Sequence, residues 1–273
     1  MTGVATSSPL LALSFPPMKR ALVLLLLLVA ATAHADWQRV SPGVDYQRIT
    51  RGTIDAHVVR IDLRNARLRV IASEESDRGL TVSEFAKKKN AIIAVNADYF
   101  DEQQRPLGLS AGACGVWTKG QKLGRRQGLV GVGRRRAEIQ QNTMTKKRWM
   151  SGAVSGWPLL NKGCAPLATL PGSDFFTLAP HPRTAVGLSK SGRTMYIVVA
   201  DGRREGVPGM TLPELAAFMD ELGACVAMNL DGGGSSAMWV DDTIVNRVSD
   251  GVERNVGNHL AVVASRDYKG CTK

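Results

Sequence analysis

A glycine-rich octapeptide carries the densest set of polar groups that could do chemistry in this 273-residue chain. It runs Asn229-Leu230-Asp231-Gly232-Gly233-Gly234-Ser235-Ser236 and follows the apolar residues 224–228 directly. Glycine accepts positive φ and lets a ligand approach backbone N–H groups closely. An isolated Asp-Gly-Gly would be interpreted as a hairpin turn with an Asx hydrogen bond. Three consecutive glycines cost more backbone entropy than a hairpin requires, which favours a ligand site.

Polar side chains border several other apolar segments of the chain. If these segment ends converge on one rim, they form a pocket lined by carboxylates, guanidinium groups and amides. Carboxylates supply an acid, a base or a nucleophile, and the arginine fork binds phosphate bidentately. The residues concerned are Asn96 and Asp98 after 91–95, Asp201 and Arg203 after 194–200, and Arg183, Thr184 and Asn258 at the starts of two further segments.

Five short motifs occur in order between Pro182 and Ala264. They are Pro182-Arg183-Thr184-Ala185, Asp201-Gly202-Arg203, Thr211-Leu212-Pro213-Glu214-Leu215-Ala216, the octapeptide, and Ser249-Asp250-Gly251. This series resembles the phosphodiester glycosidase family, and the resemblance covers most of residues 90–264. It implies a hydrolase that cleaves the glycosidic bond of a sugar-1-phosphodiester or a related anionic glycan.

The segment Ala94–Phe100 departs from that family. It falls where the family usually has Asn-Gly-Gly-(Tyr/Phe)-Phe, and Ala97 and Asp98 replace both glycines. The replacement adds side chains where the family's backbone approaches closely, so it leaves the identity of the sugar open. Asn96, Tyr99 and Phe100 persist, and the fold expectation is unchanged.

The reaction class assigns roles to the candidate residues. A phosphate leaving group is a weak base and needs little protonation, so catalysis must stabilise the oxocarbenium-like centre and the departing charge. We predict Asp231 as base or nucleophile and Asp201 as the second carboxylate. A turn cap at Asp231 and a salt bridge from Asp201 to Arg203 are the structural alternatives. We predict that the arginines bind the phosphate, that the asparagines orient sugar hydroxyls and that the loop N–H groups form an anion nest. The predicted substrate-binding residues are Asn96, Asp98, Tyr99, Arg183, Thr184, Arg203, Asn229, Gly232, Gly233, Gly234, Ser235, Ser236, Arg254 and Asn258.

Hydrophobic patterning predicts an α/β or α+β fold, a single strand-rich domain over residues 36–273 with a mixed sheet and a few helices. Capping boxes at Thr81-Val82-Ser83-Glu84 and Thr211-Leu212-Pro213-Glu214 predict helices over 81–89 and 211–222. Residues 107–180 are glycine-rich and predict only short strand fragments. The expected strands are 37–48, 54–63, 67–73, 91–95, 184–188, 194–200, 224–230, 237–240 and 258–264.

The N-terminal 35 residues predict a bacterial-type signal peptide. Lys19-Arg20 precede an apolar run, Ala33-His34-Ala35 fits a cleavage site, and Met18 is a candidate for the true start. The apolar run is shorter than a membrane span, so we expect a secreted periplasmic or extracellular protein without stable membrane insertion after cleavage. Four cysteines, Cys114, Cys164, Cys225 and Cys271, are compatible with two disulfides in any of three connectivities, although Cys225 in an apolar strand could also be free.

The chain is basic, with a formal net charge of +11, and residues 119–148 concentrate lysine and arginine. This segment is either a solvated hairpin or a patch for an anionic polymer. Nucleic acid is not expected, because a secreted protein seldom meets it and the segment contains no aromatic residue for base stacking. We expect no cofactor; calcium is the one metal that the clustered oxygens would suit. The rival function is a non-catalytic module that binds an anionic envelope polysaccharide, and the oligomeric state stays open.

Overall fold

The computed structural model describes residues 1, 36–119, 128–141 and 145–271. The predicted signal peptide, from residue 2 onward, lies outside the described residues, as do Lys122, Arg125 and Arg126 of the basic segment. The described residues from 36 onward belong to one compact unit. Among the described residues, no helix has the length and apolar character that a membrane span requires.

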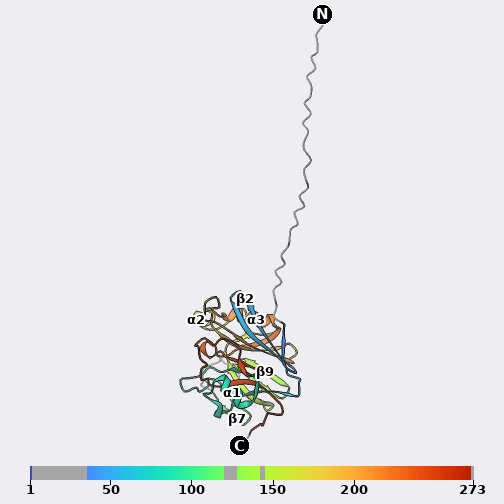
Figure 1. The fold of residues 1–273 in the computed structure, drawn as a ribbon, viewed down its shortest axis with the longest axis vertical. Coiled ribbons are helices and arrows are strands. Elements are labelled where there is room, and N and C mark those ends of the chain that lie inside the picture. The colour runs from blue at the N-terminus through green and yellow to red at the C-terminus, as the bar shows by residue number, and fades with distance from the viewer. Residues whose placement is uncertain (2–35, 120–127, 142–144, 272–273) are drawn as a thin grey trace. The chain divides into compact units, whose positions relative to one another are not determined.

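Three β-sheets make up most of this unit (Figure 1). The seven-stranded sheet has the order β1 (Gln38–Ser41), β2 (Val44–Arg51), β3 (Ile54–Asp62), β13 (Thr194–Ala200), β12 (Arg183–Ser189), β14 (Ala224–Asn229) and β11 (Leu159–Asn161). One five-stranded sheet has the order β7 (Gly115–Thr118), β6 (Ser110–Gly112), β10 (Met150–Gly156), β8 (Gly128–Gly133) and β9 (Arg136–Gln141). The other has the order β16 (Thr243–Ile244), β15 (Met238–Val240), β5 (Ala91–Asn96), β17 (His259–Ala264) and β4 (Leu68–Ala72).

The strand-rich fold expected from the sequence is confirmed, with one difference in the sheets. The paired strands among the described residues run antiparallel in three sheets, for example β12 with β13 and β12 with β14, rather than in one mixed sheet. Short turns such as Ser189–Thr194 join consecutive strands, and a short turn can connect only antiparallel neighbours.

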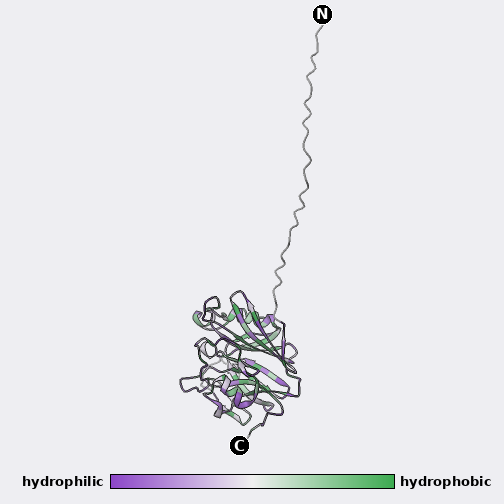
Figure 2. Cartoon of the chain, in the orientation of Figure 1, coloured by the Kyte–Doolittle hydropathy of each residue, from purple (hydrophilic) through white to green (hydrophobic). Residues whose placement is uncertain are grey.

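One apolar core is shared by all three sheets. It includes Ile61 and Ile197 of the seven-stranded sheet, Val132 of β8, and Val70 and Ile93 of the remaining sheet, all almost fully buried. These residues come from strands whose side chains alternate between two faces, so each sheet offers one apolar face to the others. Figure 2 shows hydrophobic and hydrophilic residues alternating along several of these strands.

Two helices cover the outer faces of two sheets. Helix α3 (Leu212–Glu221) packs Leu215 and Met219 against the seven-stranded sheet, and helix α1 (Val82–Lys89) packs Phe85 against β5 and β17. Both begin at the predicted capping boxes, in which the Thr81 and Thr211 hydroxyl groups accept from backbone N–H groups three residues later. A third helix, α2 (Asp174–Thr177), and two 3₁₀ turns, η1 (Glu75–Asp77) and η2 (Gly233–Ser235), complete the helical elements of the described residues.

Two sequence expectations about elements were incomplete. The expected strand 37–48 is two strands, because the chain turns at Gly43, whose φ of 84° L-residues avoid. Helix α2 and strand β16 were not predicted, since elements of four and two residues are too short for a periodic pattern.

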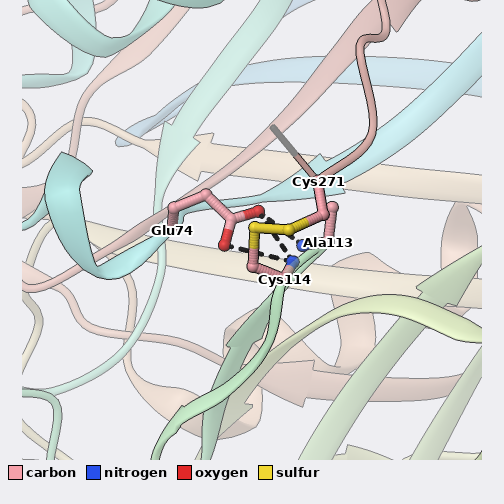
Figure 3. Close-up of a disulfide and its surroundings, with 4 residues drawn as sticks. All are labelled: Glu74, Ala113, Cys114 and Cys271. Carbon is pink, nitrogen blue, oxygen red and sulfur yellow. Dashed lines mark hydrogen bonds between the residues drawn. A yellow bond between two sulfur atoms is a disulfide. The ribbon is translucent and has the colours of Figure 1, made fainter. Parts of the chain in front are cut away.

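Both disulfides expected from the cysteine count are present. Cys164 pairs with Cys225, and Cys114 pairs with Cys271 across 157 residues of sequence. Figure 3 shows the Glu74 carboxylate beside the second bridge, where it accepts hydrogen bonds from the backbone N–H groups of Ala113 and Cys114. A groove of about 790 Å³ lies next to this disulfide, and none of the predicted site residues lines it.

Candidate active site

The glycine loop follows β14 and is held by backbone hydrogen bonds from two neighbouring segments. The Asp231 N–H donates to the Ala97 carbonyl group, and the Gly233 N–H donates to the Pro182 carbonyl group. A Cβ atom on Gly232 would lie 2.7 Å from that same Pro182 oxygen, and Gly233 has a φ of 61°. Glycine is therefore required at both positions, as the sequence predicted for a loop with close backbone approach.

Asp231 is half-buried at the start of this loop. Burial raises the pKa of its carboxyl group to about 6, against the opposing effects of the Ser235 hydroxyl, the Gly232 N–H and the Arg254 charge. The Gly232 N–H donates to Asp231 Oδ1 over 2.9 Å. A carboxylate with a pKa near 6 is ionised at neutral pH and still basic enough to accept a proton, which suits a general base.

Asn96 joins the end of β5 to the glycine loop. Its Nδ2 donates to the Asp231 carbonyl oxygen over 2.7 Å, and its Oδ1 accepts from Thr184 Oγ1 over 2.9 Å. Thr184 Oγ1 also lies 3.4 Å from Ser236 Oγ. Asn96, Thr184 and Ser236 are buried and bound to one another, so they support the loop from below.

Asp98 lies in a buried network that the sequence did not reveal. Its carboxylate accepts from the hydroxyl groups of Ser110 and Ser155 and from the Ser155 N–H, at 2.6–2.7 Å. Asn258 contributes its Oδ1 to the Asp98 N–H and its Nδ2 to Ser110 Oγ. Burial raises the pKa of Asp98 to about 7, partly offset by these hydrogen bonds. The carboxylate that replaces a family glycine is thus fully hydrogen-bonded within the protein.

Tyr99 and Asn229 meet at the Trp157 carbonyl group. Asn229 Nδ2 donates to Tyr99 Oη over 2.6 Å and to the Trp157 oxygen over 2.8 Å, and Tyr99 Oη donates to the same oxygen. Burial and the Asp231 charge both raise the pKa of Tyr99, whereas Arg183 lowers it. Tyr99 is therefore close enough to Asp231 and Arg183 to feel both charges, and its hydroxyl group stays protonated.

Arg183 is a buried cation without a carboxylate partner among the described residues. Its guanidinium group donates to three backbone carbonyl groups, those of Met210, Phe176 and Ala179, at 2.8–3.1 Å. Burial lowers the pKa of Arg183 to about 10, and the Arg203 charge acts in the same direction. A guanidinium group whose charge no carboxylate neutralises is well suited to attract an anion.

Arg203 and Arg254 lie over the glycine loop and share Asp250. Asp250 forms ion pairs with both, with Arg203 Nη1 at 3.9 Å. Arg254 Nη1 lies 3.5 Å from Ser235 Oγ, and a Cβ atom on Gly233 would lie 2.8 Å from Arg203 Nη2. Two cations thus share one carboxylate next to the loop N–H groups, so positive charge predominates there.

Asp201 is buried in a different set of contacts. Its carboxylate accepts from the Arg247 N–H and lies 3.6 Å from Arg204 Nη2, and burial raises its pKa. The side chains of Asp55, His57 and Asp201 place possible metal-ligand atoms within 4.8 Å of one another. The guanidinium groups of Arg48 and Arg204 already bind Asp55, so positive charge occupies the place where a cation would need negative charge.

Most predicted site residues come together around the glycine loop. Asp201 is instead bound to the Arg247 and Arg204 segments, and its role as second carboxylate stays a prediction. Sequence reasoning did not include Asp250, although Ser249-Asp250-Gly251 was among the family-like motifs. Trp157 and Phe176, whose rings stack 4.9 Å apart, lie in the unassigned region 107–180. The residues that gather at the loop are Asn96, Tyr99, Arg183, Thr184, Arg203, Asn229, Asp231, Ser235, Ser236 and Arg254.

This fold is that of the phosphodiester glycosidase family. Residues 89–263 match the family model of the phosphodiester glycosidases, and the chain belongs to that family. A curated relative, the SPbeta prophage-derived uncharacterized protein YomE of Bacillus subtilis, is 38% identical over 82 residues. That match covers 30% of this chain and 13% of the length of YomE.

Three solved structures have similar folds. The catalytic domain of zebrafish N-acetylglucosamine-1-phosphodiester alpha-N-acetylglucosaminidase, auto-inhibited by its pro-peptide, has a TM-score of 0.65 at 19% identity, over 85% of this chain and 84% of that one. A hypothetical protein from Synechocystis has a TM-score of 0.63 at 16% identity, over 84% and 64%. A putative exported protein from Burkholderia pseudomallei has a TM-score of 0.57 at 20% identity, over 81% and 74%. At these identities the likeness concerns the fold.

Proposed function

We propose that the protein is an exported hydrolase that cleaves the glycosidic bond of a sugar-1-phosphodiester. The observation that carries the proposal is the pairing of a half-buried carboxylate, Asp231, with a cation that has no carboxylate partner among the described residues, Arg183, whose Cα would lie 3.6 Å from a Cβ atom on the neighbouring Gly232. A glycosyl phosphodiester has an electrophilic anomeric carbon next to an anion, and this pair matches both groups. The zebrafish relative, whose name states a phosphodiester substrate, supports the same class by analogy.

In the proposed reaction, Asp231 acts at the anomeric carbon. As a base it removes a proton from water while the water oxygen bonds to the anomeric carbon; as a nucleophile it bonds to that carbon itself before water releases the sugar. In both cases the anomeric carbon–oxygen bond breaks, and the electron pair leaves on the phosphate monoester. Arg203, Arg254 and Arg183 stabilise this departing charge together with the loop N–H groups. Anomer-resolved NMR of the first product distinguishes the two courses, because a base inverts the configuration and a nucleophile retains it.

Export is part of the proposal. The N-terminal sequence has the composition of a signal peptide, and the two disulfides fit an oxidising compartment. A periplasmic or extracellular location would place the enzyme among cell-envelope glycans.

Hydrolysis of a panel of sugar-1-phosphodiesters by residues 36–273 tests the function. We expect the wild type to release free sugar and the Asp231→Asn variant to lose at least 10³-fold in kcat, a loss typical for a group that acts on the reacting centre. Thr243→Ala is the matched control, since Thr243 is exposed on β16. Binding of the diesters without turnover by the folded wild type would favour the non-catalytic module, and equal rates for wild type and Asp231→Asn would exclude Asp231.

A further inference from the structure

Three large apolar side chains are exposed on segments that border the candidate active site. Phe175 is 73% exposed, Leu178 is 56% exposed and Val252 is 72% exposed. Among the described residues, the other exposed large apolar side chains are Met1 and Val116, and Val116 is only 43% exposed. Single exposed apolar residues are ordinary, but these three lie on the two segments that bind Arg183 or carry Arg254, which points to a contact surface.

Phe175 and Leu178 lie on the segment that Arg183, a predicted phosphate-binding residue, contacts. They lie three residues apart in and just after α2, so they share one face of that turn. Arg183 holds this segment through the carbonyl groups of Phe176 and Ala179. The Phe175 ring also contacts the His181 ring edge-on at 4.9 Å. His181 is next to Pro182, which accepts the Gly233 N–H of the glycine loop.

Val252 lies on the segment that carries the site arginine. It is two residues from Asp250 and two from Arg254, which pair with each other over the glycine loop. Arg203, the other partner of Asp250, lies against Gly233. The apolar rim, defined as Phe175, Leu178 and Val252, therefore adjoins cations on both segments.

Apolar side chains next to cations that outnumber their carboxylate partners complement an amphiphile with an anionic head. We propose that the group on the far side of the substrate's phosphate is an aliphatic chain, so that the substrate class is a lipid-linked sugar-1-phosphodiester. This inference rests on the proposed function. The arginines and loop N–H groups bind the phosphate, and the apolar rim covers the first methylenes of the chain. A sugar or peptide aglycone would find few polar partners on these three side chains.

The affinity difference between alkyl and methyl phosphates measures this contact without knowledge of the sugar. Each buried methylene strengthens binding by about fourfold, so partial cover of an octyl chain predicts at least a tenfold preference. The probes are methyl phosphate and octyl phosphate, the latter below its micelle-forming concentration, titrated by calorimetry into residues 36–273. We expect octyl phosphate to bind the wild type at least tenfold more tightly than methyl phosphate.

Variants locate the contact. The double variant Phe175→Ser/Leu178→Ser should reduce the octyl preference to less than threefold, and Val252→Ser should reduce it in part. Val116→Ser is the matched control, because Val116 is an exposed apolar residue on β7 that borders the separate groove. It should keep the wild-type preference. Circular dichroism and the melting temperature confirm that each variant is folded, which the exposure of these side chains leads us to expect.

The outcomes separate this inference from the proposed function. Equal affinity of the wild type for the two phosphates, or a preference that survives the double variant, overturns the inference whether or not diesters are hydrolysed. An octyl preference lost in the double variant supports it even if no diester is hydrolysed, and only the hydrolase proposal then fails. If sedimentation shows that the apolar rim joins two copies of the chain and octyl phosphate does not separate them, the rim is a dimer contact and the inference is wrong.

Discussion

The side-chain amide of Asn96 donates to the backbone carbonyl oxygen of Asp231 over 2.7 Å, so the end of one sheet fixes the catalytic loop of another. Asn96 Oδ1 meanwhile accepts from Thr184 Oγ1 and from the Ala237 N–H. The residue predicted to bind sugar hydroxyls thus has its hydrogen-bonding groups engaged within the protein. We therefore propose that Asn96 acts by positioning Asp231.

Removal of the Asn96 side chain should therefore damage stability and activity together. Asn96→Ala leaves the Ala237 N–H and the Asp231 carbonyl group without this partner and Thr184 with only its contact to Ser236, and each unsatisfied buried group costs about 1–3 kcal/mol. We expect a loss of about 2–4 kcal/mol in urea unfolding, with a lower kcat and a smaller change in KM. Gln38→Ala, at an exposed position of β1, is a control for the removal of a side-chain amide as such. Wild-type stability of Asn96→Ala would contradict the positioning role.

The pH dependence of activity should report the raised pKa of Asp231. Because burial raises that pKa to about 6, kcat/KM should fall about tenfold per pH unit below pH 6, as the carboxylate becomes protonated. Asp98→Asn tests the other buried carboxylate, whose pKa is raised to about 7. The acidic limb should persist in that variant. Its disappearance would assign the limb to Asp98 instead.

Stability should change with pH in the opposite direction to activity. The pKa of Asp231 is raised above its ordinary value of 3.8, so between about pH 4 and 6 the folded state holds a proton that the unfolded state releases. The contribution of Asp231 to stability is therefore greatest below pH 4, falls as the pH rises to 6, and stays low above it. Asp231→Asn avoids the free-energy cost of burying a charged carboxylate. It should therefore be more stable than the wild type by roughly 2–3 kcal/mol at pH 8 but not at pH 4. Urea unfolding of both proteins at the two pH values measures the difference, and an equal difference at both would contradict the burial of the charge.

Arg254 should affect both the phosphate and the titration of Asp231. Its charge lowers the pKa of Asp231, so Arg254→Gln should shift the acidic limb to higher pH and lower kcat/KM by about 10²-fold. Arg51→Gln is the matched control, since Arg51 pairs with Glu221 at the surface. The pH–rate profiles of the three proteins provide the measurement. A limb that stays at the wild-type pH in Arg254→Gln would place Arg254 outside the site.

The Cys164–Cys225 disulfide should contribute substantially to stability. It closes a loop with a sequence separation of 61 residues and ties the segment after β11 to β14, the strand that leads into the glycine loop. Cys164→Ser/Cys225→Ser should lose about 2–5 kcal/mol. Chemical denaturation of this variant beside the corresponding Cys114/Cys271 variant measures it. A loss below about 1 kcal/mol would indicate that the unfolded state is already compact in this region.

Local sequence signals identified the elements around the glycine loop. A few consecutive residues were enough to predict the three-glycine loop, the two capping boxes and the apolar strands that flank Asn96 and Asp231. The structure confirms the loop and both helices. Hydrogen-bond partners that are distant in sequence could not be predicted. The hydroxyl groups that bind Asp98 come from β6 and β10, and the carbonyl groups that hold Arg183 come from 176–210. No periodicity specifies such pairs, because tertiary packing alone brings them together.

Asp201 illustrates the same limit. The sequence offered Arg203 as its salt-bridge partner, because the two are neighbours along the chain. The structure gives it Arg204, the Arg247 N–H and a place beside Asp55, while Arg203 turns toward Asp250 with a φ of 58°. A residue in the left-handed conformation changes the direction of the chain locally, and an arginine in the sequence does not predict that conformation.

The shared anchoring of the glycine loop has a consequence for folding intermediates. Asp231 is bound to Ala97 and Asn96 from the sheet of β5, and Gly233 to Pro182 beside β12 of the seven-stranded sheet. Either sheet could form its own backbone pairing, yet neither alone holds the loop in place. If the protein is the proposed hydrolase, its activity thus requires both sheets to be docked, and a partly folded chain would be inactive. Gradual denaturation should accordingly abolish turnover before it abolishes β-sheet circular dichroism.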